Sequence, residues 1–208
     1  MAKITEMKEC RNKDRVNIYI DGEFCTAIDK FVAYKSFLKV GKEISVEQLE
    51  QLAFEEERES ALKKAIAYVT QYRVTEKKAR DYLKGKEYSK AVIEETMEKL
   101  KKYSFISDEQ YAVDFMQSRL KSKGAKLIKM ELSQKGISRD IISALETNPE
   151  DETEACKKQA EKYMKRKEKT RENYAKLFQN LAGKGFDFGI IKSVIEEIKG
   201  ETEIEDWM

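Results

Sequence analysis

Leu132-Ser-Gln-Lys-Gly-Ile-Ser138 and Leu181-Ala-Gly-Lys-Gly-Phe-Asp187 are two copies of one segment, and Leu83-Lys-Gly-Lys-Glu-Tyr-Ser89 is a third. The copies begin 49 residues apart, and an apolar pair follows each at the same offset: Val92-Ile93, Ile141-Ile142 and Ile190-Ile191. A fixed internal period indicates one supersecondary unit used repeatedly, and such proteins are usually binding scaffolds. The repeat therefore favours a binding surface over a single catalytic pocket.

The Lys-Gly pairs within this segment predict how the second helix of each copy ends. Gly136 and Gly185 directly follow apolar helical segments. Helices commonly end in a residue with left-handed backbone, a conformation that glycine adopts freely. The first copy has Glu87 at the equivalent position, so we expect that turn to be shaped differently.

Apolar residues around each copy recur at helical spacing. Before the first copy they form one helical face, made of Ala61, Ala65, Tyr68, Val69 and Tyr72. Equivalent residues precede the other copies, so we predict a mainly α-helical protein of tandem three-helix repeats. Their expected ranges are 58–106, 107–148 and 149–200, followed by an acidic tail at 201–208 that contains Trp207.

Residues 1–57 have a different pattern and predict a small N-terminal module that contains a β-hairpin. Val16, Ile18 and Ile20 alternate with polar residues before Asp21-Gly22, and a second alternating run follows. An Asp-Gly pair between alternating runs predicts a tight hairpin turn. Residues 31–38 predict a short helix, and Ser45-Val-Glu-Gln48 is a capping box that opens another.

The composition argues against an enzyme. The 208 residues contain no histidine, which removes Ser-His and Cys-His catalysis and every histidine-containing metal site. The three cysteines are far apart, and no phosphate-binding glycine loop is present. We expect no catalytic residues, no metal and no cofactor. Since no signal peptide or membrane-length apolar run occurs, we expect a cytoplasmic protein, not bound to a membrane and monomeric.

Basic residues gather in two runs, although the net charge is only +2. Arg119 to Arg139 contains seven basic residues and one acid, and Lys157 to Lys176 contains nine basic residues and three acids. A charge run is usually only a solvated helix face. These two fall at equivalent places, around the loop between the first and second helices of repeats two and three. Stacked repeats would align them into one basic stripe that suits a phosphate backbone.

The predicted contacts to DNA are Arg73, Arg119, Lys121, Lys123, Lys126, Lys129, Lys165, Arg166, Lys167, Lys169 and Arg171. Binding through them should be independent of sequence. If six to ten phosphates are touched, affinity should fall roughly 10³–10⁵-fold between 50 and 200 mM salt.

Several candidates have structural alternatives. Arg73 either pairs with an acid near Asp81 or Glu109, or contacts a partner, and we favour the pair. Asp108-Glu109 reads as a helix cap rather than a metal site. The aromatic residues at helical spacing are interpreted as core rather than as a base-stacking platform: Tyr68, Tyr72, Tyr82, Phe115, Tyr163 and Phe178.

Four stretches together resemble the RecX family, bacterial regulators of the RecA recombinase. They are Tyr72-Arg-Val-Thr-Glu76, Phe105-Ile-Ser-Asp-Glu-Gln-Tyr-Ala112, the two Lys-Gly turns, and Asn17-Ile-Tyr-Ile-Asp-Gly-Glu23, which is similar to the N-terminal extension of longer, Gram-positive-type members. The resemblance covers nearly the whole chain. Ser107 and Glu87 depart from the family pattern, both at helix caps.

The resemblance implies a non-enzymatic modulator, an elongated curved array of repeats in the groove of a RecA–DNA filament. It would inhibit RecA ATPase and strand exchange in homologous recombination, DNA repair and the SOS response. The implied partners are the RecA filament and single- and double-stranded DNA. The alternative is a free-standing DNA-binding helical protein, a helix-turn-helix-like regulator or an architectural factor, that binds DNA without RecA. An enzyme is a third and more distant possibility.

Overall fold

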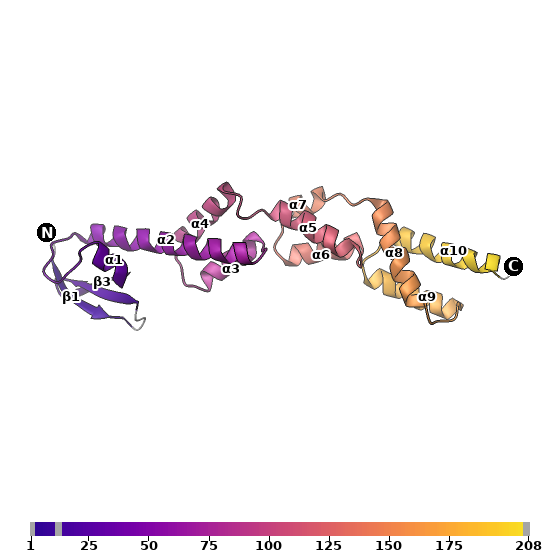
Figure 1. Cartoon of the computed structure of the whole chain (residues 1–208), viewed down its shortest axis with the longest axis horizontal. Helices are drawn as coiled ribbons and strands as arrows, with labels where there is room; N and C mark the ends of the chain where they lie inside the picture. Colours follow the sequence, from indigo (N-terminus) through magenta and orange to yellow (C-terminus); the bar gives the residue numbers. More distant parts are fainter. Residues whose placement is uncertain (1–2, 11–13, 206–208) are drawn as a thin grey trace. The chain divides into compact units, whose positions relative to one another are not determined.

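The computed structural model describes residues 3–10 and 14–205, with side chains described as far as residue 200 (Figure 1). The chain folds into two units. The first holds the chain up to Tyr72 together with Ala79–Phe105, and the second holds Arg73–Lys78 and the chain from Ile106 onward. Each unit is described by itself.

The first unit begins with an antiparallel sheet in the order β1 (Ile4–Glu9), β2 (Arg15–Ile20), β3 (Glu23–Asp29). The predicted hairpin is confirmed, since Ile20 pairs with Glu23 across the turn. Asp21 and Gly22 both have positive φ, 51° and 90°, as the tight turn requires. Val16, Ile18 and Ile20 are buried, so the alternation gives the sheet its core face.

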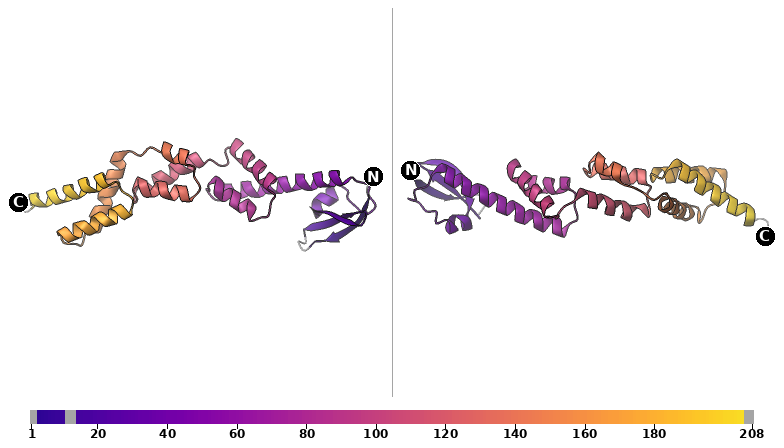
Figure 2. Two further views of the ribbon diagram at one scale, coloured as in Figure 1. Left: turned by 180° about the vertical axis from the view of Figure 1, so that it is seen from behind. Right: turned by 90° about the horizontal axis from the view of Figure 1, so that it is seen from above.

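A short helix, α1 (Lys30–Lys35), follows the sheet, and a long one, α2 (Val46–Gln71), connects the sheet with the helices of the same unit. The capping box at Ser45 and Gln48 is present, as predicted. Helix α2 continues past residue 57, where the sequence analysis places the end of the N-terminal module. No glycine or proline occurs from 46 to 71 to interrupt it. Figures 1 and 2 show α2 lying along β3 at one end and along α4 at the other.

Helices fill the rest of the described chain, which confirms the mainly α-helical fold and its tandem three-helix units. Trp207 lies outside the described residues, and the start of the predicted acidic tail continues the last helix. The remaining helices are α3 (Glu76–Lys84), α4 (Lys90–Lys102), α5 (Asp108–Leu120), α6 (Ala125–Gln134), α7 (Arg139–Ala144), α8 (Pro149–Met164), α9 (Arg171–Gly183) and α10 (Phe188–Glu205).

The turns that share the 49-residue period share one backbone conformation. Gly136 and Gly185 have φ of 89° and 82°, which confirms the predicted left-handed helix ends. Glu87 has φ of 63°, so the first copy keeps this conformation without glycine, and the expectation of a different shape was wrong there. Backbone hydrogen bonds from Ile137 to Leu132 and from Phe186 to Leu181 close the two glycine turns.

Within the second unit these turns are docking points for an earlier loop. The hydroxyl of Thr75 donates to the carbonyl of Lys135 at 3.0 Å, and the amide of Gly124 donates to the carbonyl of Lys184 at 2.9 Å. Both contacts join residues 60 apart, and Thr75 and Gly124 are themselves 49 apart. Each therefore joins the loop before a second helix to the Lys-Gly turn of the following repeat. We call this contact the loop-to-turn clasp.

A carboxylate supports each clasp. The amide of Glu76 donates to Asp108 at 2.8 Å, and the equivalent amide of Ala125 donates to Glu152 at 3.0 Å. Both amides lie at the start of a helix, where backbone donors lack partners within the helix. The sequence interpretation of Asp108 as a helix cap holds in a different form, because Ser107 caps α5 and Asp108 instead accepts from the first amide of α3.

Close packing explains why the second and third turns contain glycine. A Cβ on Gly136 would lie 2.4 Å from Cδ of Lys77, and a Cβ on Gly185 would lie 2.3 Å from Cβ of Leu127. Gly124 approaches more closely still, since its Cβ would lie 2.1 Å from the carbonyl oxygen of Gly185. No side chain fits between the loop and the turn without moving one of them.

Candidate nucleic-acid interface

The predicted DNA contacts of repeats two and three lie at loops between helices. Arg119 lies in the last turn of α5 and Lys121 caps that helix, and Lys126 and Lys129 lie on α6. In repeat three Lys165 caps α8, and Arg171 begins α9. Arg119, Lys121, Lys126, Lys165, Arg166, Lys167, Lys169 and Arg171 are exposed, whereas Lys123 and Lys129 are half-buried.

The two loops lie at opposite ends of α9. Lys165 to Lys169 come just before its first residue, Arg171, and Gly124 is hydrogen-bonded to Lys184, just after its last residue. Thirteen helical residues at 1.5 Å each separate them by about 20 Å. The basic residues therefore form two clusters rather than the continuous stripe that the sequence predicts. At 3.4 Å per base pair this separation corresponds to roughly six base pairs of a duplex.

Ion pairs occupy several lysines outside the loop of repeat three. Lys158 pairs with Glu154 at 2.6 Å and Lys176 with Glu172 at 2.6 Å, and Lys157 pairs with Glu197. The hydrogen bonds from Lys158 and Lys176 hold the pKa of each glutamate partner below its usual range. The flanks of this basic run are thus neutralised locally, and its exposed positive charge is concentrated between Lys165 and Arg171.

Within the described part of the chain, Lys123 also forms an ion pair, unlike the neighbouring Lys121. Its ammonium pairs with Glu131, the one acid of the first basic run, and both side chains are largely buried. Lys123 therefore fastens the loop between α5 and α6 to α6. Whether it or the other predicted contacts bind DNA stays a prediction.

Cations also lie over aromatic rings. The guanidinium of Arg119 lies 5.3 Å from the centre of the Phe115 ring, and the ammonium of Lys135 lies 5.2 Å from it. Lys167 lies 3.1 Å from the ring of Tyr163. These rings are half-buried, so they border the core instead of filling it. Tyr72 departs further from the core interpretation, since it is 52% exposed.

Arg73 pairs with an acid, the alternative that the sequence analysis favours, and the acid is Asp114 rather than Asp81 or Glu109 itself. Its guanidinium contacts the carboxylate of Asp114, within the second unit. Glu109 instead accepts a hydrogen bond from the Ser107 hydroxyl at 2.8 Å. The Arg73 side chain remains 67% exposed, so this pair leaves most of its surface accessible.

Sequence reasoning missed two cations on α10. Lys192 and Lys199 line a groove of about 510 Å³ together with Arg171 and Tyr174. The ammonium of Lys199 lies 5.1 Å from the Tyr174 ring. The two lysines are seven residues apart, a spacing that returns to the same helix face and could have revealed them.

No group of three or more potential metal ligands occurs among the described residues. Cys156 is fully buried, and burial raises the pKa of its thiol to about 11. A thiol with this pKa is a poor nucleophile at neutral pH. No helix in the described part of the chain is long and apolar enough to cross a membrane.

These features define a class, a tandem three-helix-repeat protein whose repeats dock loop to turn and whose exposed cations gather at loops. Three family models match: "Regulatory protein RecX N-terminal domain" over residues 2–45, "RecX, second three-helix domain" over 107–145, and "RecX, third three-helix domain" over 150–195. The chain belongs to the RecX family of regulatory proteins, and its resemblance to that family is confirmed.

Curated relatives and solved structures of RecX proteins match most or all of the chain. The regulatory protein RecX of Clostridium beijerinckii is 36% identical, with 100% of both chains covered. That of Clostridium perfringens strain 13 is 33% identical over 99% of this chain and 100% of its own. A crystal structure of regulatory protein RecX has a TM-score of 0.68 at 27% identity, covering 94% of this chain and 100% of that one. RecX from Lactobacillus salivarius has a TM-score of 0.64 at 28% identity, covering 69% and 97%.

Proposed function

We propose that this chain regulates the RecA recombinase by binding the RecA–DNA filament and inhibiting its ATPase and strand exchange. Membership of a family of regulatory proteins supports this. The observation that carries it is the pair of cationic loops about 20 Å apart at the ends of α9. Two separated clusters suit an extended polyanion better than a small ligand.

The mechanism needs no catalytic residue in this chain. Lysine and arginine side chains that neutralise phosphates release counterions, which gives binding without sequence preference. A protein that binds one state of a filament more tightly than another shifts the filament toward that state. Binding that favours a state with slow ATP turnover inhibits the ATPase.

The test is RecA ATPase on single-stranded DNA with the full chain added. Replacing Lys165, Arg166 and Lys167 by glutamine should weaken inhibition several-fold and reduce its salt dependence. A matched variant replaces three exposed lysines of the first unit, Lys63, Lys84 and Lys90. It removes the same charge and should inhibit like the unchanged protein. Equal inhibition by all three proteins at physiological salt would refute the role of the loop.

Free-standing DNA binding remains the competing function. It predicts tight binding to bare DNA that is unchanged when RecA is added. A titration of labelled duplex and single-stranded DNA, with and without RecA, separates the two. Tight, sequence-specific binding in the absence of RecA would favour the competing function.

A further inference from the structure

Three aromatic rings of the N-terminal module lie within one short segment, residues 31–37, and are exposed. Phe31 is 71% exposed, and Tyr34 and Phe37 are each 80% exposed. The opposite side of the same segment fills the core of the module, where Ala33 and Leu38 are buried. An outward helical face is ordinarily polar, and clustered exposed apolar residues mark interaction sites. We call Phe31, Tyr34 and Phe37 the ring platform.

Phe37 occupies a position that the backbone assigns to glycine. Its amide donates to the carbonyl of Tyr34, and the amide of Leu38 donates to that of Ala33, which is the hydrogen-bond pattern of a helix end that favours glycine. Phe37 has φ of 52° there, a left-handed conformation that is strained for a large side chain. Its ring is exposed, so packing does not compensate for the strain. Such strain is typical of functional positions.

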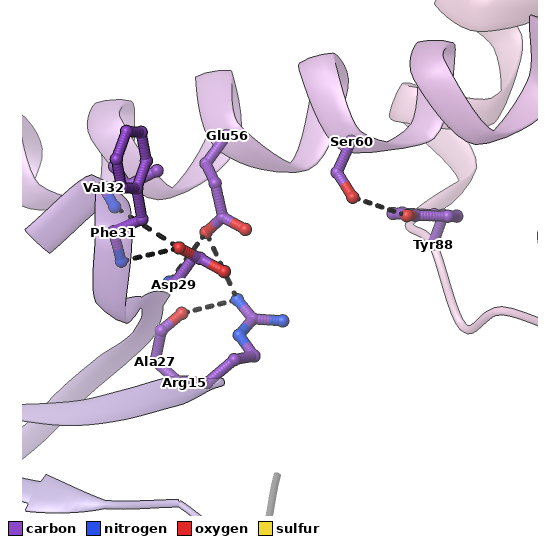
Figure 3. Close-up of polar contacts among 8 residues, drawn as sticks. All are labelled: Arg15, Ala27, Asp29, Phe31, Val32, Glu56, Ser60 and Tyr88. Atoms are coloured by element: carbon purple, nitrogen blue, oxygen red, sulfur yellow. Dashed lines mark hydrogen bonds and ion pairs between the residues drawn. The ribbon is translucent and has the colours of Figure 1, made fainter. Parts of the chain in front are cut away.

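Hydrogen bonds and an ion pair fix the start of α1, which carries two of the rings. The carboxylate of Asp29 accepts hydrogen bonds from the amides of Phe31 and Val32 at 2.7 and 3.3 Å, and the amide of Asp29 donates to Glu56 of α2 at 3.1 Å. Arg15 contacts the same Glu56 at 3.7 Å (Figure 3). Phe31 and Tyr34 are three residues apart on α1 and therefore neighbours on its surface. The platform is held rigidly before any partner arrives.

The charge around the platform identifies the kind of partner. From Lys30 to Lys42 the chain has four lysines and no acid. Lys30 pairs with Glu9, and Lys42 donates to the carbonyl of Ser36. Lys35 and Lys39 are exposed, and neither forms an ion pair among the described residues. Exposed rings with adjacent cations are how proteins hold single-stranded nucleic acid, because bases stack on the rings and phosphates meet the cations.

We infer that the ring platform is a binding site for the bases of single-stranded nucleic acid. This contact differs from that of the cationic loops, because bases stack on the rings, whereas the loops contact phosphates. It goes beyond the proposed function and does not depend on it. An acidic or apolar protein surface is the competing occupant, and the test separates the two.

The experiment compares two probes of equal length and charge, a fluorescein-labelled oligothymidylate and the same oligomer with abasic sites. Fluorescence anisotropy of the full chain should show tighter binding to the oligothymidylate, and Phe31→Ala with Tyr34→Ala should remove this preference. Each base that loses its ring partner is expected to cost roughly 5- to 150-fold in affinity. Tyr103→Ala is the matched control, since Tyr103 is 64% exposed and lies outside the platform.

Phe37→Gly separates binding from folding. Because glycine suits φ of 52°, this variant should have a higher melting temperature and yet bind oligothymidylate more weakly. A ring that only stabilises the fold would give the opposite change in melting temperature. Replacing Lys165, Arg166 and Lys167 by glutamine should weaken binding of both probes equally. The preference for the oligothymidylate therefore stays intact whether or not the proposed function is correct.

Two results would overturn the inference. One is an unchanged preference for bases in the Phe31 and Tyr34 double variant. The other is normal oligothymidylate binding by that variant with loss of binding to a RecA filament, which would assign the platform to a protein partner.

Discussion

Gly124→Ala tests the loop-to-turn clasp directly. Gly124 has φ of −75° and ψ of 158°, a conformation that alanine adopts without strain. The only obstacle is the neighbouring turn, because the new Cβ would lie 2.1 Å from the carbonyl oxygen of Gly185 and 2.2 Å from the amide nitrogen of Phe186. Both are backbone atoms and cannot rotate away, so the loop and the turn must separate.

The size of the effect follows from that separation. Ordinary contact begins at 3.4 Å, so the loop must retreat by about 1.3 Å. That movement takes the 2.9 Å hydrogen bond from Gly124 to Lys184 out of range, at a cost of about 1 kcal/mol. It also pulls the amide of Ala125 from Glu152, which is only 6% exposed, and an unsatisfied buried acceptor costs about 1–3 kcal/mol. The expected loss is about 2–4 kcal/mol.

Urea unfolding of the full chain, followed by far-UV circular dichroism and by hydrogen exchange at the Gly124 amide, measures this loss. Gly183→Ala is the matched control, because Gly183 lies at the end of α9 and a Cβ there meets nothing within 4 Å. Alanine in a helix is better than glycine by up to about 1 kcal/mol, so the control should be neutral or stabilising. The clasp is refuted if Gly124→Ala is as stable as the unchanged protein, or if the control is equally destabilised.

Three further predictions follow from single buried or strained residues. The pKa of Cys156, about 11 when folded against 9.0 for a free thiol, implies that stability falls as pH rises through this interval, because the unfolded thiol ionises first. Unfolding at pH 10 should be easier by about 1 kcal/mol, and Cys156→Ala should abolish this component in parallel urea titrations. Glu87→Gly should raise the free energy of unfolding by up to about 1 kcal/mol, because glycine suits its φ of 63°, and a lower melting temperature would contradict this. Glu152→Ala should lose about 1–3 kcal/mol in chemical unfolding by leaving the Ala125 amide unpaired, whereas Glu152→Gln, which keeps an acceptor oxygen, should lose less.

The repeats could be predicted from the sequence because their signals are local. A left-handed turn needs glycine, and an apolar face needs residues three and four apart, so both leave marks within a few positions. The clasp leaves no such mark. Its partners, Gly124 and Lys184, are 60 residues apart, and the 49-residue period shows that two turns are equivalent without showing which loop each one meets. The conformation of the first turn could not be predicted either, because Glu87 adopts the left-handed backbone there although it is not glycine.

The candidate interface was predictable in composition but not in detail. Both basic runs were visible, yet the pairing of Lys123 with Glu131 depends on how the loop before α6 folds back along that helix. Arg73 shows the same limit. An acid near it could be expected, but its choice of Asp114 over Glu109 depends on which face of α5 meets the α2–α3 loop. Packing between elements decides such pairs, and a linear pattern does not record it.

The clasp also bears on which loop is available to a partner. In the second unit, the loops at Thr75 and Gly124 are both docked on Lys-Gly turns. The equivalent loop of repeat three is different, because its backbone hydrogen bonds are local, from Lys167 to Met164 and from Thr170 to Glu168. It is docked on no such turn in the described part of the chain, and it has the densest basic sequence. A docked loop is constrained by its neighbour at the point of contact, where Gly124 must remain small, whereas no residue of the loop of repeat three is restricted by such a turn in the described chain. The loop from Lys165 to Thr170 is therefore the part of the repeat that we expect to contribute most of the polyanion affinity. Replacing Lys165, Arg166 and Lys167 should weaken binding more than replacing the same number of exposed cations at Arg119, Lys121 and Lys126.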